Sequence, residues 1–291
     1  MDAVRFGHAR DDRGEPVLLA ESDGRRVEAP GLTLDDLLSD PAAMASTRED
    51  LERRLAAGEG EPPVTEELLP PVLRPGKIVA IGLNYLDHSR EFGTAPPTSP
   101  IVFPKLTSSL RGHGAIVRWD PDVTAEVDWE VELAVILGRH LAHASPDEAM
   151  AGVFGYTVLN DVTARDIQRS ETQWMRAKGL DTFCPMGPVA VTADEIPEPQ
   201  GLALRSRVNG RAMQDSTTSE MIFSVAELLS RLSRSFTFEP GDVLATGTPL
   251  GVGAFRDPPI HLQDGDVMEM EIERIGVLRN HCASGPTKEA A

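Results

Sequence analysis

The chain has 291 residues, 41% of them hydrophobic, which is enough to bury a full core in one large domain with a smaller one beside it. Its 46 acidic and 28 basic residues give a net charge of −18, which argues against a nucleic acid partner because phosphates bind basic surfaces. No membrane span and no basic, apolar leader are evident, so we expect a cytoplasmic protein. Two cysteines, Cys184 and Cys282, do not suggest a disulfide framework.

The first 72 residues are predicted to form a small domain of their own. Short strands separated by Asp-Arg-Gly and Ser-Asp-Gly turns are expected at 3–6, 16–19 and 25–29. Thr33 then caps the start of a helix, and a charged helix is expected at 47–57. The segment 58–77, rich in Pro and Glu, is predicted to be a linker into a strand at 78–81.

His88 and Glu91 lie three positions apart after that strand. On a helix they share a face, so the Glu91 carboxylate can bind one imidazole nitrogen while the other nitrogen takes a proton from water. A His-x-x-Glu pair is more often found on the surface, but its position directly after Gly-Leu-Asn-Tyr, 82–85, favours a site. The adjacent segment 93–100, rich in Pro and Thr, is typical of a lid.

Glu130 and Glu132 interrupt an otherwise apolar, strand-like stretch, 128–137. A strand places both carboxylates on one face, whereas a helix would separate them by roughly 200°. Two like charges on a half-buried strand repel each other, so a divalent cation between them is one interpretation and a solvent-facing strand is the other.

Asp161 adds a third carboxylate at the end of a predicted strand, 155–161, where sites are often built. Three carboxylates without neighbouring Cys or well-spaced His favour Mg²⁺ or Mn²⁺, with Ca²⁺ as a further option, over zinc or copper. The three acids and one divalent ion would keep a formal charge near −1. Arg165 and Lys178 are therefore candidates to hold an anionic substrate.

The C-terminal half is predicted to be mostly β. Asn209-Gly210 indicates a hairpin, and residues 265–272 alternate between apolar and polar. Ser145 and Ser224 begin capping boxes of two helices. The glycine-rich run 246–253 lacks the ending of a phosphate loop. Its N–H groups can cradle a carboxylate with help from the Thr248 hydroxyl, or it is a tight turn.

Five motifs in this order closely resemble the fumarylacetoacetate hydrolase (FAH) superfamily, over about residues 76–282. They are 84–91, 128–133, 160–166, 178–179 and 246–253. The resemblance implies an α+β, mainly β fold, with a rolled mixed β-sheet core, flanking helices and a small N-terminal domain. The domains expected are 1–72, a catalytic domain at 73–283 and a flexible tail at 284–291.

The resemblance also implies roles for site residues. Metal ligands would be Glu130, Glu132 and Asp161. The catalytic residues would be His88, Glu91 and Lys178, and the substrate-binding residues Arg165, Gln168 and Thr248. Longer animal-type members place a fourth carboxylate ligand seven residues before the histidine, where this chain has Ile81, so waters are expected to complete the coordination.

The function expected from these residues is metal-dependent hydrolysis of a C–C bond in an acylpyruvate or related 1,3-diketo acid, such as a fumarylpyruvate-like substrate. His88, oriented by Glu91, would activate water, and Lys178 would help to hold the enolate. The alternatives are decarboxylation of an oxaloacetate-type 2-oxo acid or isomerisation of an unsaturated oxo acid. A metal-dependent dicarboxylate-binding protein is the non-enzyme alternative. The resemblance further implies a homodimer.

Overall fold

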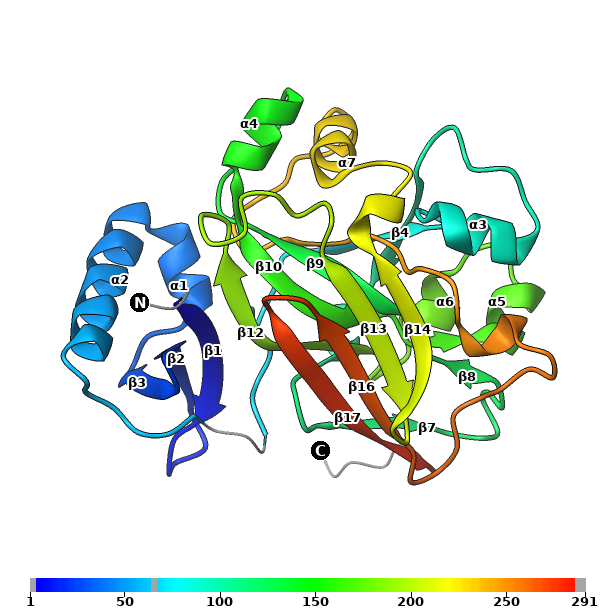
Figure 1. Ribbon diagram of the computed structural model, residues 1–291, viewed down its shortest axis with the longest axis horizontal. Coiled ribbons are helices and arrows are strands. Elements are labelled where there is room, and N and C mark those ends of the chain that lie inside the picture. Colours follow the sequence, from blue (N-terminus) through cyan, green and yellow to red (C-terminus); the bar gives the residue numbers. More distant parts are fainter. Residues whose placement is uncertain (1–3, 64–66, 286–291) are drawn as a thin grey trace.

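Two β-sheets pack against each other, and helices lie around their edges (Figure 1). The computed structural model describes residues 4–63 and 67–285. Strands β9 and β10 of the larger sheet contact β13 and β16 of the smaller one, so the main hydrophobic core lies between the sheets. This architecture confirms the mainly β, α+β fold class that the resemblance implies.

The larger sheet has the order β3-β2-β1-β12-β10-β9-β15-β4-β5, and β6 pairs with β12. Its strands are β1 (Arg5–Arg10), β2 (Pro16–Ser22), β3 (Arg25–Ala29), β4 (Ile78–Gly82), β5 (Ile101–Lys105), β6 (Leu110–Arg111), β9 (Val131–Leu137), β10 (Val153–Asn160), β12 (Cys184–Thr192) and β15 (Val243–Ala245).

The smaller sheet has the order β14-β13-β16-β17-β7. Its strands are β7 (Ile116–Trp119), β13 (Ala203–Val208), β14 (Arg211–Thr217), β16 (Val267–Ile272) and β17 (Gly276–Ser284). A separate pair is formed by β8 (Val127–Asp128) and β11 (Thr163–Ala164).

The helices are short apart from one in the N-terminal segment. They are α1 (Leu34–Ser39), α2 (Pro41–Ala56), α3 (Leu86–Phe92), α4 (Pro146–Ala151), α5 (Arg165–Ser170), α6 (Met175–Lys178) and α7 (Val225–Leu232), with 3₁₀ turns η1 (Thr107–Ser109), η2 (Thr218–Glu220) and η3 (Gly253–Phe255).

The N-terminal strands extend the larger sheet, because β1 pairs antiparallel with β12, Phe6 lying opposite Ala190. Helices α1 and α2 cover this end of the molecule, at the left of Figure 1. The domain boundary at residue 72 stays a prediction. The same holds for the tail 284–291: β17 runs to Ser284, and residues 286–291 lie outside the described part of the chain.

Two N-terminal predictions had wrong boundaries. The first strand runs to Arg10 rather than ending at residue 6. The charged helix begins at Pro41 rather than at residue 47. Asp40 explains the earlier start, because its carboxylate accepts the N–H groups of Ala42 and Ala43, and a proline at the first helical position has no N–H to satisfy.

Strand β9 is buried along its whole length, between β10 and β15. Its β-branched and aliphatic residues suit a strand covered on both faces. Leu159 of β10 lies opposite Glu132, and the Asp161 N–H donates to the Glu130 carbonyl over 2.9 Å. This register carries Asp161 alongside the two glutamates.

Several local predictions are confirmed. Asn209-Gly210 turns between β13 and β14, with Asn209 at φ 52° and Gly210 at φ 73°, as a type I′ hairpin requires. Ser145 and Glu148 form the full capping box predicted at α4. At α7 the Ser224 hydroxyl accepts the Glu227 N–H as predicted, but the Glu227 carboxylate accepts from Arg231 instead of completing the box.

Candidate active site

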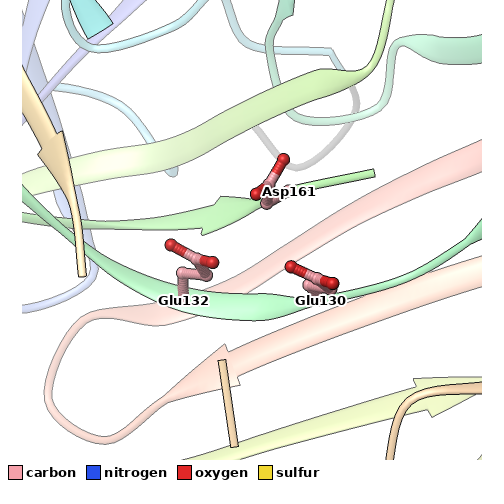
Figure 2. Close-up of side chains that lie close together, drawn as sticks. All are labelled: Glu130, Glu132 and Asp161. Carbon is pink, nitrogen blue, oxygen red and sulfur yellow. The ribbon is translucent and has the colours of Figure 1, made fainter. Parts of the chain in front are cut away.

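Three carboxylates come together where β9 begins and its antiparallel neighbour β10 ends, at the centre of the strand order of the larger sheet. One oxygen from each of Glu130, Glu132 and Asp161 lies within 4.8 Å of the other two, and all three residues are buried. Figure 2 shows Glu132 on β9 and Glu130 just before it, both projecting toward Asp161, which directly follows β10. Oxygens bound to one Mg²⁺, Mn²⁺ or Ca²⁺ ion lie at most about 5 Å apart, so this donor set fits a hard divalent cation.

Three buried cations share the carboxylates. Lys178 Nζ donates to Glu130 Oε2 over 2.7 Å and to Asp161 Oδ2 over 2.8 Å. Lys105 Nζ donates to Asp161 Oδ1 over 2.5 Å and to the Phe183 carbonyl over 2.7 Å. Arg165, on α5, lies 2.7 Å from Glu130 Oε1 through one guanidinium nitrogen.

The charges of this cluster do not cancel. Arg165 Nε also donates to fully buried Asp128 over 2.8 Å, so four carboxylates face three cations, and one negative charge would remain if all four were ionised. Burial, followed by repulsion from Asp161 and Glu130, raises the pKa of Glu132 well above its ordinary value. A divalent cation would remove that repulsion.

Glu130 and Lys178 are both held in their charged forms. Burial opposes the Glu130 carboxylate, but Lys178 and Arg165 outweigh it and lower its pKa. Burial likewise opposes the Lys178 ammonium, but Asp161 and Glu130 outweigh it and raise its pKa. Lys178 is therefore a hydrogen-bond donor at this site rather than a base.

The predicted His88–Glu91 pair forms on helix α3. His88 Nδ1 lies 2.8 Å from Glu91 Oε2, and both side chains are mostly buried. The helix ends at Gly93, which takes up the left-handed conformation, φ 73°, that closes a helix with glycine. The second Glu91 oxygen accepts the Gly251 N–H over 2.8 Å, which fixes the carboxylate and, through it, the imidazole ring.

A pocket of about 390 Å³ lies between the carboxylate cluster and helix α3. His88, Glu130, Lys178, Arg165 and Gln168 line it. The rest of its wall comes from the end of β4, α3, α5, the glycine-rich loop and the segments around Trp174 and Phe255: Ile81, Gly82, Leu83, Phe92, Arg169, Trp174, Thr248, Ala254 and Phe255. Gly82 is required here, because a Cβ at this position would lie 2.4 Å from the Trp174 ring.

Three N–H groups of the glycine-rich loop, and that of Ala254 just after it, bind carboxylates of the protein rather than facing a substrate. The Gly247 N–H donates to Glu132, that of Gly251 to Glu91, and those of Gly253 and Ala254 to Asp128, all within 3.0 Å. These four donors hold carboxylates of the protein itself, because those carboxylates are buried and need partners. The loop is thus a scaffold for the acids of the site.

Thr248 lines the pocket, but its hydroxyl donates to the Val131 carbonyl over 3.0 Å and accepts from Gln214 over 2.8 Å. Gln168 accepts from Arg165 over 3.0 Å and lines the same pocket. The structure therefore brings all nine predicted site residues into one region. Their roles in substrate binding and catalysis stay predictions.

Sequence reasoning missed Lys105, Asp128 and Arg169. A lone lysine closing the apolar run Ile-Val-Phe-Pro-Lys is a signal that could have pointed to Lys105. The other two lie within motifs that were recognised, but nothing local shows that Asp128 binds a distant loop or that Arg169 reaches the pocket.

The fold and this site define an enzyme of the FAH type with a carboxylate triad that could hold a divalent metal. The model of the fumarylacetoacetate (FAA) hydrolase C-terminal domain matches residues 77–283, and the chain belongs to this family. The resemblance to the FAH superfamily is thereby confirmed, and the buried carboxylate triad could bind a divalent metal in this family member.

Two curated relatives, one human and one bacterial, have the same sequence identity to this chain. The mitochondrial oxaloacetate tautomerase FAHD2A of Homo sapiens is 46% identical over 215 residues, which are 73% of this chain and 68% of the relative. Oxaloacetate tautomerase YisK of Bacillus subtilis is 46% identical over 213 residues, 72% of this chain and 71% of the relative.

Solved structures extend the similarity to nearly the whole chain. A fumarylacetoacetate hydrolase from Exiguobacterium antarcticum is 35% identical, with a TM-score of 0.82 and coverage of 97% of this chain and 100% of that one. A 5-carboxymethyl-2-hydroxymuconate delta-isomerase from Mycobacterium smegmatis is 34% identical, with a TM-score of 0.76 and the same coverage. Among the described residues, no helix is both long and apolar enough to cross a membrane.

Proposed function

We propose that this chain catalyses keto–enol tautomerisation of oxaloacetate, or of a closely related 2-oxo diacid. This is enolate chemistry of the kind that the alternative expectation named, and the names of the curated relatives favour it over cleavage of an acylpyruvate. The cytoplasmic location and the homodimer also remain proposals, the human relative being a mitochondrial protein.

The observation that carries the proposal is that backbone N–H groups of the glycine-rich loop bind carboxylates of the protein itself. Hydrolysis of a C–C bond passes through a tetrahedral oxyanion, which backbone N–H groups commonly stabilise. Here the N–H groups of Gly247, Gly251, Gly253 and Ala254 already donate to carboxylates of the protein. Tautomerisation forms an enolate rather than a tetrahedral oxyanion, and Lys178 and a cation beside the carboxylates would hold its oxygen without the loop.

The residues needed for tautomerisation line the pocket. In the keto-to-enol direction the imidazole of His88 would take a proton from carbon 3, and the resulting imidazolium would give a proton to the enolate oxygen, directly or through water; the reverse direction would run the same transfers backwards, with Glu91 orienting the ring. Lys178 stays protonated and would donate a hydrogen bond to the 2-oxo oxygen as negative charge develops on it.

A divalent cation held by Glu130, Glu132 and Asp161 would supply Lewis-acid stabilisation of the same oxygen. The distal carboxylate of a diacid would bind near Gln168 and Arg169, which lie one after the other on α5 and both line the pocket. The aromatic rings of Trp174 and Phe255 would limit access of water to the reacting carbon.

The experiment compares the loss of the enol with the formation of pyruvate in one sample. Purified protein is mixed with the enol form of oxaloacetate and Mg²⁺, loss of enol absorbance is recorded, and pyruvate is measured in the same sample. We expect metal-dependent loss of the enol without matching pyruvate. Pyruvate formed as fast as the enol disappears would assign decarboxylation instead. Cleavage of acetylpyruvate without activity on the oxaloacetate enol would restore the hydrolase.

A further inference from the structure

Asp128 is a fully buried carboxylate that does not line the pocket, yet it binds two parts of the site at once. Its Oδ1 accepts the N–H groups of Trp129 over 2.8 Å and Gly253 over 2.7 Å. Its Oδ2 accepts the Ala254 N–H over 3.0 Å and Arg165 Nε over 2.8 Å. Both oxygens are therefore held by two donors each.

The first part that Asp128 binds is the 3₁₀ turn η3. Gly253 approaches so closely that an added Cβ would lie 2.0 Å from the Ile260 carbonyl oxygen and 2.8 Å from Asp128 Oδ1. Glycine at 253 thus lets the backbone reach the carboxylate. Two residues on, the Phe255 ring stands edge to face with His88, at 5.8 Å between ring centroids, and with Phe92 at 5.0 Å. Fixing η3 fixes the aromatic wall beside the imidazole.

The second part is Arg165, whose guanidinium is divided between Asp128 and the candidate ligand Glu130. A guanidinium that lost the Asp128 charge would turn to Glu130 in a bidentate pair, the geometry that arginine favours with a carboxylate. Glu130 would then have less negative charge and fewer free oxygens for a cation. Asp128 keeps Arg165 from taking Glu130 entirely.

We propose that Asp128 is a positioning residue with two effects. It fixes the position of the Phe255 ring beside His88, and it keeps Glu130 available to a divalent cation. It contacts neither substrate nor the reacting atoms. Its effect passes through η3 on one side and through Arg165 on the other.

The test uses Asp128→Asn, which keeps the shape but has one acceptor oxygen where the carboxylate has two. Its oxygen can accept from only one side, so its NH₂ group would face the N–H donors of the other side, either those of η3 or that of Arg165. Mn²⁺ binding is titrated by calorimetry without substrate, and oxalate, which copies the planar oxygens of an enolised 2-oxo acid, is then titrated into the Mn²⁺-loaded protein. We expect both affinities to fall by roughly tenfold or more, the worth of one hydrogen bond to a charged group.

Gly253→Ala separates the two effects. It displaces η3 without changing any charge, so oxalate affinity should fall while Mn²⁺ affinity stays within about twofold of wild type. Asp242→Asn is the matched control. Asp242 is also fully buried and accepts the backbone N–H groups of Lys77 over 3.0 Å and Glu239 over 2.6 Å, together with the Lys77 ammonium. It does not line the pocket, so neither affinity should change.

Unchanged Mn²⁺ affinity in Asp128→Asn would overturn the Arg165 half of the proposal, and unchanged oxalate affinity in Gly253→Ala would overturn the η3 half. Equal losses in Asp128→Asn and Asp242→Asn would show a general effect of stability and overturn both. If Asp128→Asn does not fold, the η3 half is decided by Gly253→Ala. Arg165→Gln then decides the other half, since freeing Glu130 from the guanidinium should tighten Mn²⁺ binding, and weaker or unchanged binding would refute it.

The Mn²⁺ titration does not depend on the reaction, whereas the oxalate titration rests on the proposed function through its 2-oxo acid substrate class. The two can therefore fail separately. A wild-type protein without tautomerase activity would refute the proposed function and leave the Mn²⁺ result for Asp128 intact.

Discussion

Lys105 and Asp161 form an ion pair whose two side chains have no exposed surface, with 2.5 Å between Lys105 Nζ and Asp161 Oδ1. The pair joins β5, at the edge of the larger sheet, to the residue that follows β10 near its centre. Lys178 holds the other Asp161 oxygen, so the carboxylate is fixed on both sides.

Replacing Lys105 by Met should destabilise the protein strongly. The substitution keeps most of the side-chain volume but leaves Asp161 sharing the single ammonium of Lys178 with Glu130, and breaking a buried pair in this way costs about 3–5 kcal/mol. Urea unfolding measures the change. Lys77→Met is the control: its side chain is about one-third exposed, and the buried Asp242 that it leaves keeps two backbone N–H donors, so its loss should cost less. Equal losses in the two variants would contradict the structural importance of the Lys105 pair.

Glu132→Gln should remove the response to metal and, in the presence of a chelator, stabilise the protein at neutral pH. The raised pKa of Glu132 means that the folded state holds a proton that the unfolded state releases above the ordinary value of 4.5. The stability that this group contributes is therefore fully present below pH 4.5 and is lost as pH rises toward the folded pKa, by about 1.4 kcal/mol per pH unit. Glutamine has no such proton to lose.

The measurement for Glu132 is thermal melting with EDTA and with Mg²⁺ at several pH values. In wild type, Mg²⁺ at a hundredfold excess over Kd should add about 2.7 kcal/mol, and in Glu132→Gln it should add almost nothing. A variant that Mg²⁺ still stabilises as much as wild type would remove Glu132 from the metal site.

His88→Ala should lower turnover of the oxaloacetate enol by about 10²–10⁴-fold, the usual worth of a positioned acid–base group. Mn²⁺ affinity should stay nearly unchanged, because His88 bonds to Glu91 and is not among the carboxylate triad. Glu91→Gln should act in the same direction but more mildly, since an amide oxygen still orients the ring. Wild-type turnover in His88→Ala would assign the proton transfer to another group.

His8 should make the protein less stable in mild acid. It is fully buried, its Nε2 accepts the Leu34 N–H over 3.0 Å, and its Nδ1 lies 3.2 Å from the Pro70 carbonyl oxygen. Burial lowers its pKa below the ordinary value of 6.5. The unfolded chain therefore binds a proton first, and stability that is present above pH 6.5 is lost as pH falls below it.

The pH effect of His8 is measured as the urea midpoint at about pH 7.5 and about pH 5.5, in wild type and in His8→Gln. Glutamine cannot take up a proton in this range. We expect the midpoint of wild type to fall further between the two pH values than that of the variant. Parallel changes in both proteins would exclude His8 as the cause.

Light scattering should give twice the chain mass of 31.5 kDa at micromolar concentration. The homodimer is an expectation from the family resemblance, and a two-fold partner is the commonest assembly for a soluble homo-oligomer. A mass of 31.5 kDa that does not change with concentration would make this protein a monomer.

Much of the site could be predicted from the sequence because its parts depend on local geometry. The period of two on a strand places Glu130 and Glu132 on one face, and the helical spacing of three brings His88 to Glu91. The caps of α1, α4 and α7 and the Asn209-Gly210 turn follow equally from short-range backbone preferences.

The assembly of these parts depended on the tertiary structure. The register between β9 and β10 brings Asp161 to the glutamates, and the edge strand β5 delivers Lys105 from 56 residues away. The partners of the glycine-rich loop were equally hidden, since its N–H groups bind carboxylates more than 100 positions distant. Local propensity carries no information about such pairings, because they are selected by the burial of both sheets together and by the need of every buried charge for a partner.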